Sequence, residues 1–128
     1  MTPPDLTIAE IKALVPARDF ALSQRFYTAI GFEPVWSTDE LAYFRHGGTS
    51  FLLQNFFVQA HAENFVMHLL VRNVDDWWQH LHDRGIADTF RVSIGTPELR
   101  PWGQRDFILF DPTGVLWRIG QSMPARAE

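Results

Sequence analysis

One short pattern occurs twice in this chain. Asp19 is followed twelve residues later by Gly31, and Asn73 is followed at the same interval by Gly85, with the two copies 54 residues apart. An Asp or Asn that begins a helical stretch and a Gly that ends it are the usual caps of a helix between strands. Two copies of such a unit can pack against each other, and the surface between them is the natural place for a ligand.

A second similarity between the two halves of the chain supports the repeat. Residues 44–48 lead into 49–54, and residues 110–114 lead into 115–120, and both pairs suggest hairpins with Gly in the turn. The pattern predicts an α+β fold in which β-α-β-β-β occurs twice. The expected strands lie near 10–16, 33–36, 41–45, 50–56, 64–71, 90–94, 106–110 and 115–120, with helices over 20–30 and 74–84, a polar loop over 59–63 and one long loop over 95–105.

Composition limits the possible functions. With 128 residues and 46% hydrophobic residues, the chain is expected to be a single globular domain over residues 1–128. It has no apolar stretch of about 20 residues, no signal peptide and no cysteine, which favours a cytoplasmic protein without disulfides or thiolate chemistry. A net charge of −4 without a basic run argues against nucleic-acid binding.

Two motifs resemble a known superfamily. Val15–Asp19 with Gly31-Phe32 resembles the opening unit, and Arg100–Phe107 with Phe110–Gly114 resembles the closing signature, of the vicinal oxygen chelate superfamily, above all its bleomycin resistance proteins. The superfamily also includes glyoxalase I and ring-cleaving dioxygenases. The resemblance implies two tandem βαβββ modules, about 8–58 and 62–121, that form a curved mixed sheet with a ligand groove in a homodimer.

The resemblance also permits a test for a metal. Catalytic members of the superfamily hold a divalent metal with four side chains, and the matching positions here are Lys12, Leu52, Val66 and Arg118. None of these offers the imidazole or carboxylate donors that such a metal needs. We therefore expect no metal, no cofactor and neither glyoxalase nor dioxygenase chemistry.

Other catalytic groups are sparse. His68 is the one histidine expected to point into the cavity, although a lone His on an apolar strand is more often packed in a core. Asp111 is best explained by the turn that it begins. We predict no catalytic residue.

Two tryptophans are the main candidates for binding a flat ligand. The resemblance to bleomycin resistance proteins implies that Trp102 matches the residue that stacks on the drug. It also implies that Trp36 matches the aromatic residue that faces this tryptophan across the groove. Stacking between aromatic planes adds about 0.5–1.5 kcal/mol per pair. The alternative for Trp102 is packing against a partner subunit.

Two cations should reach the same pocket from opposite copies. Lys12 and Arg118 could hold the carboxylate or phosphate of a ligand, or could pair with Glu10, Glu98 or Asp106, and internal pairing is slightly favoured. Gln54 and Phe56, at the end of the first copy, complete the candidate groove. Aromatic residues at such a place are more often core or interface.

Three functions remain. The first is a non-enzymatic protein that sequesters a planar ligand in a groove shared by two subunits, with bleomycin-like antibiotics as the family precedent. The second is a metal-free enzyme of the same fold that acts on a small anionic substrate. The third is an interaction module with a vestigial cavity.

Overall fold

The computed structural model of the chain describes residues 2–124 and contains the βαβββ unit twice. The first module consists of β1 (Leu14–Pro16), α1 (Phe20–Ile30), β2 (Glu33–Ser37), β3 (Leu41–His46) and β4 (Thr49–Gln54). A short helix, α2 (Gln59–Glu63), leads to the second module, which consists of β5 (Val66–Leu70), α3 (Val74–Asp83), α4 (Ile86–Phe90), β6 (Glu98–Leu99), β7 (Gln104–Phe110) and β8 (Leu116–Ser122).

The strands form two four-stranded mixed sheets with the same topology. Sheet A has the order β1-β4-β3-β2 and sheet B the order β5-β8-β7-β6. In each sheet the first and last strands of the module are parallel neighbours, with Leu14 opposite Leu52 and His68 opposite Arg118. Leu14 and His68 differ by the spacing of the sequence repeat, so the α+β class and the duplicated unit are confirmed.

The expected caps set the helix boundaries. Asp19 Oδ1 accepts the amide of Leu22 at 3.1 Å, and Asn73 Oδ1 accepts the amide of Asp76 at 3.0 Å. Gly31 ends α1 with φ of 126°, which a residue with a Cβ rarely adopts. Gly85 also has a positive φ, but it leads directly into α4, a helix that the sequence did not predict.

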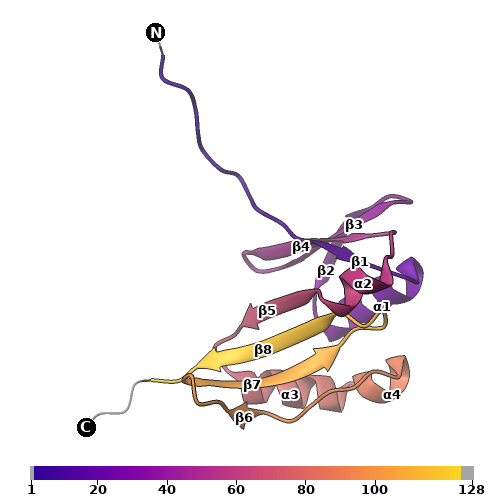
Figure 1. Ribbon diagram of the computed structural model, residues 1–128, viewed down its shortest axis with the longest axis vertical. Coiled ribbons are helices and arrows are strands. Elements are labelled where there is room, and N and C mark those ends of the chain that lie inside the picture. Colours follow the sequence, from indigo (N-terminus) through magenta and orange to yellow (C-terminus); the bar gives the residue numbers. More distant parts are fainter. Residues whose placement is uncertain (1, 125–128) are drawn as a thin grey trace.

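The helices cover one face of each sheet, where the aromatic core lies (Figure 1). Tyr27 from α1 is fully buried, and its ring lies against the rings of Phe51 and Trp117 at centroid distances of 4.9 and 5.5 Å. Its hydroxyl donates to Asp111 Oδ2 at 2.5 Å and accepts the Trp117 indole N–H at 2.9 Å. Asp111 Oδ1 accepts three amides of its own turn, as expected for a turn residue.

The N-terminal strand expected over residues 10–16 is shorter than predicted. Only Leu14–Pro16 is a strand, and the backbone of residues 2–12 leads away from the body of the chain (Figure 1), although the Glu10 and Lys12 side chains reach back to sheet A. Leu6, Ile8 and Ile11 are more than four-fifths exposed. A strand exists only where a neighbouring strand supplies hydrogen bonds, and this segment, here called the N-terminal arm, has no such neighbour in its own chain.

Three other predicted segments differ in the structure. Residues 90–94 do not form a strand, because Phe90 ends α4 and Ile94 makes a single bridge to Leu109. The edge strand β6 lies instead within the segment predicted as the long loop, and the predicted polar loop over 59–63 is helix α2. None of the described helices is long and apolar enough to cross a membrane.

Candidate functional site

The candidate site lies on the faces of the two sheets that the helices leave uncovered, here called the open faces. Side chains alternate along each strand, so Ala42 and Phe44 of β3 point into the core while Tyr43 lies on the open face. On β5, Met67 and Leu69 pack against the core while His68 is exposed.

The open face of sheet A carries an aromatic stack. Trp36 from β2 and Tyr43 from β3 lie nearly parallel, at 5.8 Å and 9°. The ammonium of Lys12 lies 5.0 Å from the centre of the Tyr43 ring, within the range of a cation–π contact. Trp36 is 48% exposed, so one large aromatic surface is free to receive a flat molecule.

Glu10 binds two members of this stack, Lys12 and Tyr43. Its carboxylate pairs with Lys12 Nζ at 2.5 Å and accepts the Tyr43 hydroxyl at 3.1 Å and the Ser50 hydroxyl. The hydrogen bond from Lys12, followed by that from Ser50, lowers the pKa of the Glu10 carboxyl below its usual value. Lys12 therefore has an internal partner, one of the pairings expected from the sequence.

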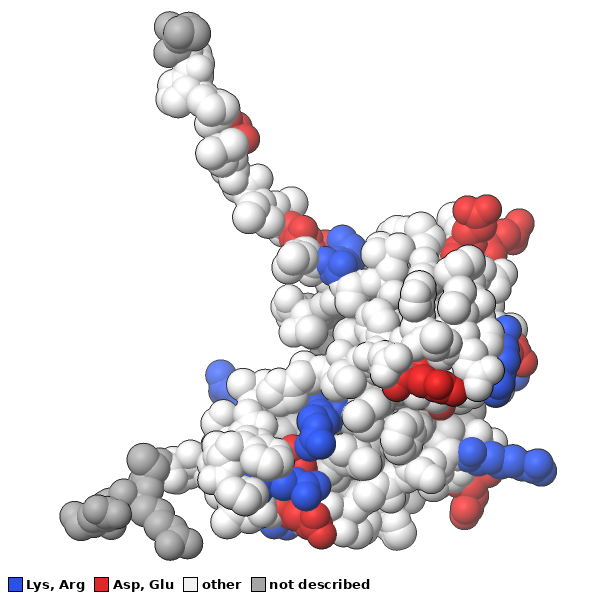
Figure 2. Space-filling view, in the orientation of Figure 1, with Lys and Arg blue, Asp and Glu red and all other residues white. Residues whose placement is uncertain are grey.

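The open face of sheet B carries a buried carboxylate between two arginines. The Asp106 side chain is only 1% exposed, and it accepts Arg100 Nε at 2.7 Å and Arg118 Nη1 at 3.0 Å. Arg100 also pairs with Glu98 at 3.0 Å. The hydrogen bond to Asp106 raises the pKa of the Arg100 guanidinium. In Figure 2, positive and negative side chains lie side by side over β6–β8 while most of the surrounding surface is uncharged.

Gly120 provides the room for this cluster. A Cβ at Gly120 would lie 3.3 Å from the Asp106 Cβ, 3.4 Å from Gln104 Oε1 and 3.6 Å from His68 Nε2. Its lack of a side chain lets His68, Asp106 and Gln104 crowd together beside Arg118. His68 is therefore part of a polar cluster on the open face and is not packed in a core.

Trp102 stands on the turn between β6 and β7. The amide of Arg100 donates to the carbonyl of Gln104 at 2.6 Å, and Gly103 has φ of 84°, so the turn is tight and holds the tryptophan at its tip. Trp102 is 63% exposed. This exposure leaves indole surface available for stacking.

The structure brings some of the predicted site residues together and separates others. His68 and Arg118 are register partners on sheet B, and Gln54 and Phe56 line one small pocket of about 130 Å³. Trp36 and Trp102 belong to different sheets of the chain. Lys12 precedes β1 and pairs with Glu10, while Arg118 lies on β8 and pairs with Asp106, so each has an internal carboxylate partner, the interpretation that the sequence slightly favoured.

Two residues of this surface were missed as site residues. Tyr43 alternates with the buried Ala42 and Phe44, a period-two pattern that could have placed it beside Trp36. Arg100 was noted only as part of a motif. Its link to Asp106 depends on the pairing of β6 with β7, in which Leu99 lies opposite Arg105, and no local signal indicates it.

The four positions that match the metal ligands of the catalytic members carry side chains that are apolar or paired with carboxylates. Leu52 and Val66 are apolar side chains on sheets A and B, while Lys12 and Arg118 are engaged with carboxylates. Over residues 2–124, no three His, Asp or Glu side chains come together in a way that could hold a metal ion.

Comparison with known proteins identifies the family. The profile of the glyoxalase/bleomycin resistance protein/dioxygenase superfamily matches residues 8–119. A bleomycin resistance determinant encoded on the transposon Tn5 is 25% identical, with a TM-score of 0.76 over 90% of this chain and 98% of that one. A bleomycin-binding protein solved with bleomycin is 24% identical, with a TM-score of 0.76 over 90% and 99%.

A third similar structure is TnmS3, an antibiotic binding protein from Streptomyces sp. CB03234. It is 22% identical, with a TM-score of 0.73 over 92% of this chain and 99% of that one. No curated protein matches the chain significantly. The match to the family profile spans most of the sequence, and the chain belongs to the glyoxalase/bleomycin resistance protein/dioxygenase superfamily.

Proposed function

We propose that the protein is a non-enzymatic binder that sequesters a planar small molecule, with bleomycin-like antibiotics as the first candidates. The observation that carries this proposal is a pair of exposed indoles, Trp36 stacked on Tyr43 on the open face of sheet A and Trp102 at the tip of a tight turn. Burying an aromatic surface against a flat ligand is favourable. The similarity to a bleomycin-binding protein and to an antibiotic binding protein supports this choice of ligand.

The groove would lie between two subunits. Trp36 and Trp102 sit on different sheets, so a ligand can contact both if sheet A of one subunit faces sheet B of its partner. Val66, Leu70 and Leu99 leave apolar surface on sheet B, and the N-terminal arm exposes three large apolar side chains. A contiguous exposed apolar patch typically marks a protein–protein contact. A homodimer would cover both surfaces and complete the site.

A calorimetric titration with bleomycin tests the proposal. Trp102→Ala should weaken binding by about 1–3 kcal/mol, as the truncation of an aromatic anchor usually does. Trp102→Phe is the matched control, because it keeps an aromatic plane on the same turn, and it should retain most of the affinity. Equal affinities for all three proteins would exclude Trp102 from the site, and no binding of bleomycin or other planar antibiotics would refute the proposed function.

The second candidate is a metal-free enzyme acting on a small anionic substrate. It is favoured by the partly exposed guanidinium of Arg118 next to His68, a cation and a titratable group on one surface. Against it, Asp106 and Glu98 balance the charges of Arg118 and Arg100. Sulfate and small carboxylates should therefore leave the melting temperature unchanged, and stabilisation that Arg118→Met removes would favour the enzyme instead.

A further inference from the structure

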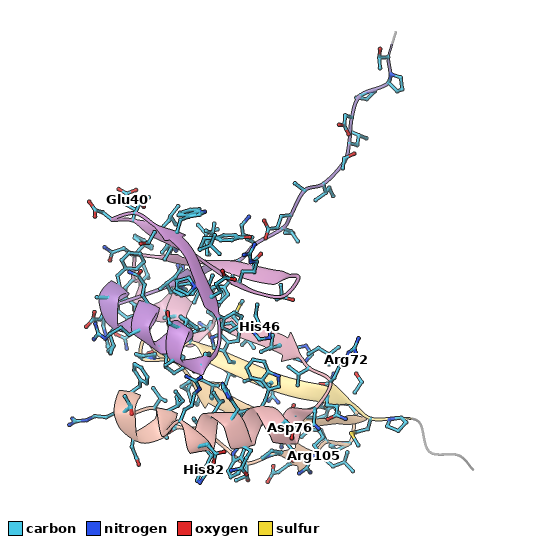
Figure 3. All side chains as sticks on the ribbon, turned by 180° about the vertical axis from the view of Figure 1, so that it is seen from behind. Glu40, His46, Arg72, Asp76, His82 and Arg105 are labelled. Atoms are coloured by element: carbon cyan, nitrogen blue, oxygen red, sulfur yellow. The ribbon has the colours of Figure 1, made fainter. Side chains whose placement is uncertain are left out.

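A second pocket lies away from the open faces, where the two modules meet on the helical side. It has a volume of about 400 Å³ and is lined by Ile30, Gly31, His46, Asp76, Trp77 and His80. Figure 3 views this side and labels His46, at the end of β3, and Asp76, on α3, at the junction of the modules. None of its lining residues belongs to the groove proposed above.

Hydrogen bonds fix the two histidines in the walls of this pocket. His46 Nδ1 lies 3.1 Å from the carbonyl of Gly31, and His80 Nε2 lies 3.2 Å from the carbonyl of Ile30. A carbonyl oxygen only accepts, so both ring nitrogens donate. The imidazole planes are thus oriented by the backbone at the end of α1, and no ligand is needed to order them.

Trp77 is the third aromatic ring in the wall of this open pocket. Its ring centre lies 5.4 Å from that of His46 and 6.0 Å from that of His80, at angles of 61° and 76°. Gly31 forms the fourth side, and a Cβ there would approach His80 Nε2 at 3.7 Å and the Trp77 ring at 4.0 Å. A compact group can therefore lie against three aromatic rings without moving the backbone.

The charges of the lining select the kind of ligand. No lysine or arginine lines the pocket, and its one formally charged side chain is Asp76. The Asp76 carboxylate forms none of the salt bridges found over residues 2–124, so it is available to a ligand. Arg72 lines the adjoining pocket, on the other side of the His46–Trp77 pair. Aromatic faces next to a carboxylate favour a cation.

We propose that this pocket binds a small organic ammonium ion, with the cation against the Trp77 ring and beside the Asp76 carboxylate. The cation–π attraction is strongest for indole, and the ion pair with Asp76 adds to it. The proposal is independent of the function proposed for the open faces, because the two sites share no residue.

Choline is the probe, and its neutral carbon analogue 3,3-dimethylbutan-1-ol, which has the same shape without the charge, is the matched ligand control. Binding is followed by the shift of the Trp77 indole N–H resonance, which the Trp77→Phe variant assigns. We expect saturable choline binding and affinity for the neutral analogue at least about tenfold weaker.

Two isosteric variants test the carboxylate. Asp76→Asn should weaken choline at least about fivefold, while Asp83→Asn, at the other end of α3 and outside the pocket, should leave the affinity unchanged. Both variants should melt close to the parent protein, because the Asp76 cap contact to Asn73 uses its backbone amide. Absence of saturable binding, equal affinity for the neutral analogue, or equal effects of the two substitutions would overturn the proposal.

Discussion

Asp106 shares its buried carboxylate between Arg100 and Arg118, and the two arginines should therefore be partly redundant. With Arg118→Met, Asp106 keeps its 2.7 Å contact to Arg100 and a loss of only about 1 kcal/mol is expected, since Arg118 is 38% exposed and its ion pair is screened by water. Arg100→Met leaves the contact to Arg118 in the same way. Each single substitution should be tolerated.

The double variant should behave differently. With both arginines replaced by methionine, the Asp106 carboxylate, 1% exposed, has no cationic partner, and an uncompensated buried charge costs about 3–5 kcal/mol. The loss should therefore exceed the sum of the single losses by more than about 1 kcal/mol, the signature of a shared partner. Adding Asp106→Asn to the double variant should restore a large part of the stability, because it removes the buried charge.

Urea unfolding at one fixed protein concentration is the suitable assay. Urea adds no ions that screen the pairs, and a fixed concentration keeps any contribution from association constant. If the two single losses simply add, or if Asp106→Asn worsens the double variant, the carboxylate is not held by the two arginines in common and the assignment of the cluster as structural is wrong.

Three further outcomes are expected. Tyr27→Phe should lower the free energy of unfolding by about 1–3 kcal/mol, because it removes a hydrogen-bond donor from the buried Asp111. Burial raises the Asp111 pKa and the Tyr27 hydrogen bond opposes that rise, so this loss of stability should grow from about pH 4 to about pH 7. A loss in urea unfolding that does not change with pH would refute this. Sedimentation should show a dimer at micromolar concentration, and deletion of residues 2–11 should shift it toward monomer; a monomeric full-length chain would contradict the shared groove. Dialysed protein should retain no stoichiometric Zn, Ni, Mn or Fe, as metal analysis can check, because Leu52 and Val66 lack donors.

The burial of Asp111 fixes the direction of this pH dependence. A carboxyl whose pKa is raised by folding contributes stability that is complete below its unfolded pKa and is lost as the pH rises through the folded pKa. Without the Tyr27 hydroxyl, the charged form of Asp111 loses a donor and the folded pKa rises further. The variant is therefore penalised most where Asp111 would be ionised, which is the high-pH side of the range.

The sequence predicted those parts of the fold that depend on local chemistry. Asp19, Asn73 and Gly31 cap helices because side chains and φ angles act within a few residues. The first strand was predicted to begin at residue 10, yet a strand also requires a partner, and residues 10–12 find no neighbouring strand in their own chain. Phe90 was assigned to a strand for the same reason, but it ends a short helix packed against α1 and α3.

The candidate sites were harder to predict, because they depend on long-range register. Arg118 was expected to pair with one of several carboxylates, and the choice of Asp106 follows from Asp106 lying opposite Gly120, which has no side chain. His46 ends β3 and Trp77 lies on α3, two elements that are far apart in the sequence. Their meeting in one pocket depends on how the modules dock, which no spacing in the sequence encodes.

The turn between β7 and β8 has a consequence for the dynamics of the chain. Asp111 binds the amides of Thr113, Gly114 and Val115 and also the Tyr27 hydroxyl, and Thr113 Oγ1 accepts the amide of Arg18 at 3.1 Å. This hairpin turn of the second module is thus anchored inside the first. Its amides should exchange with deuterium as slowly as those of the central strands, since releasing them requires both modules to open together. We therefore expect the duplicated halves to unfold as one cooperative unit and not one at a time.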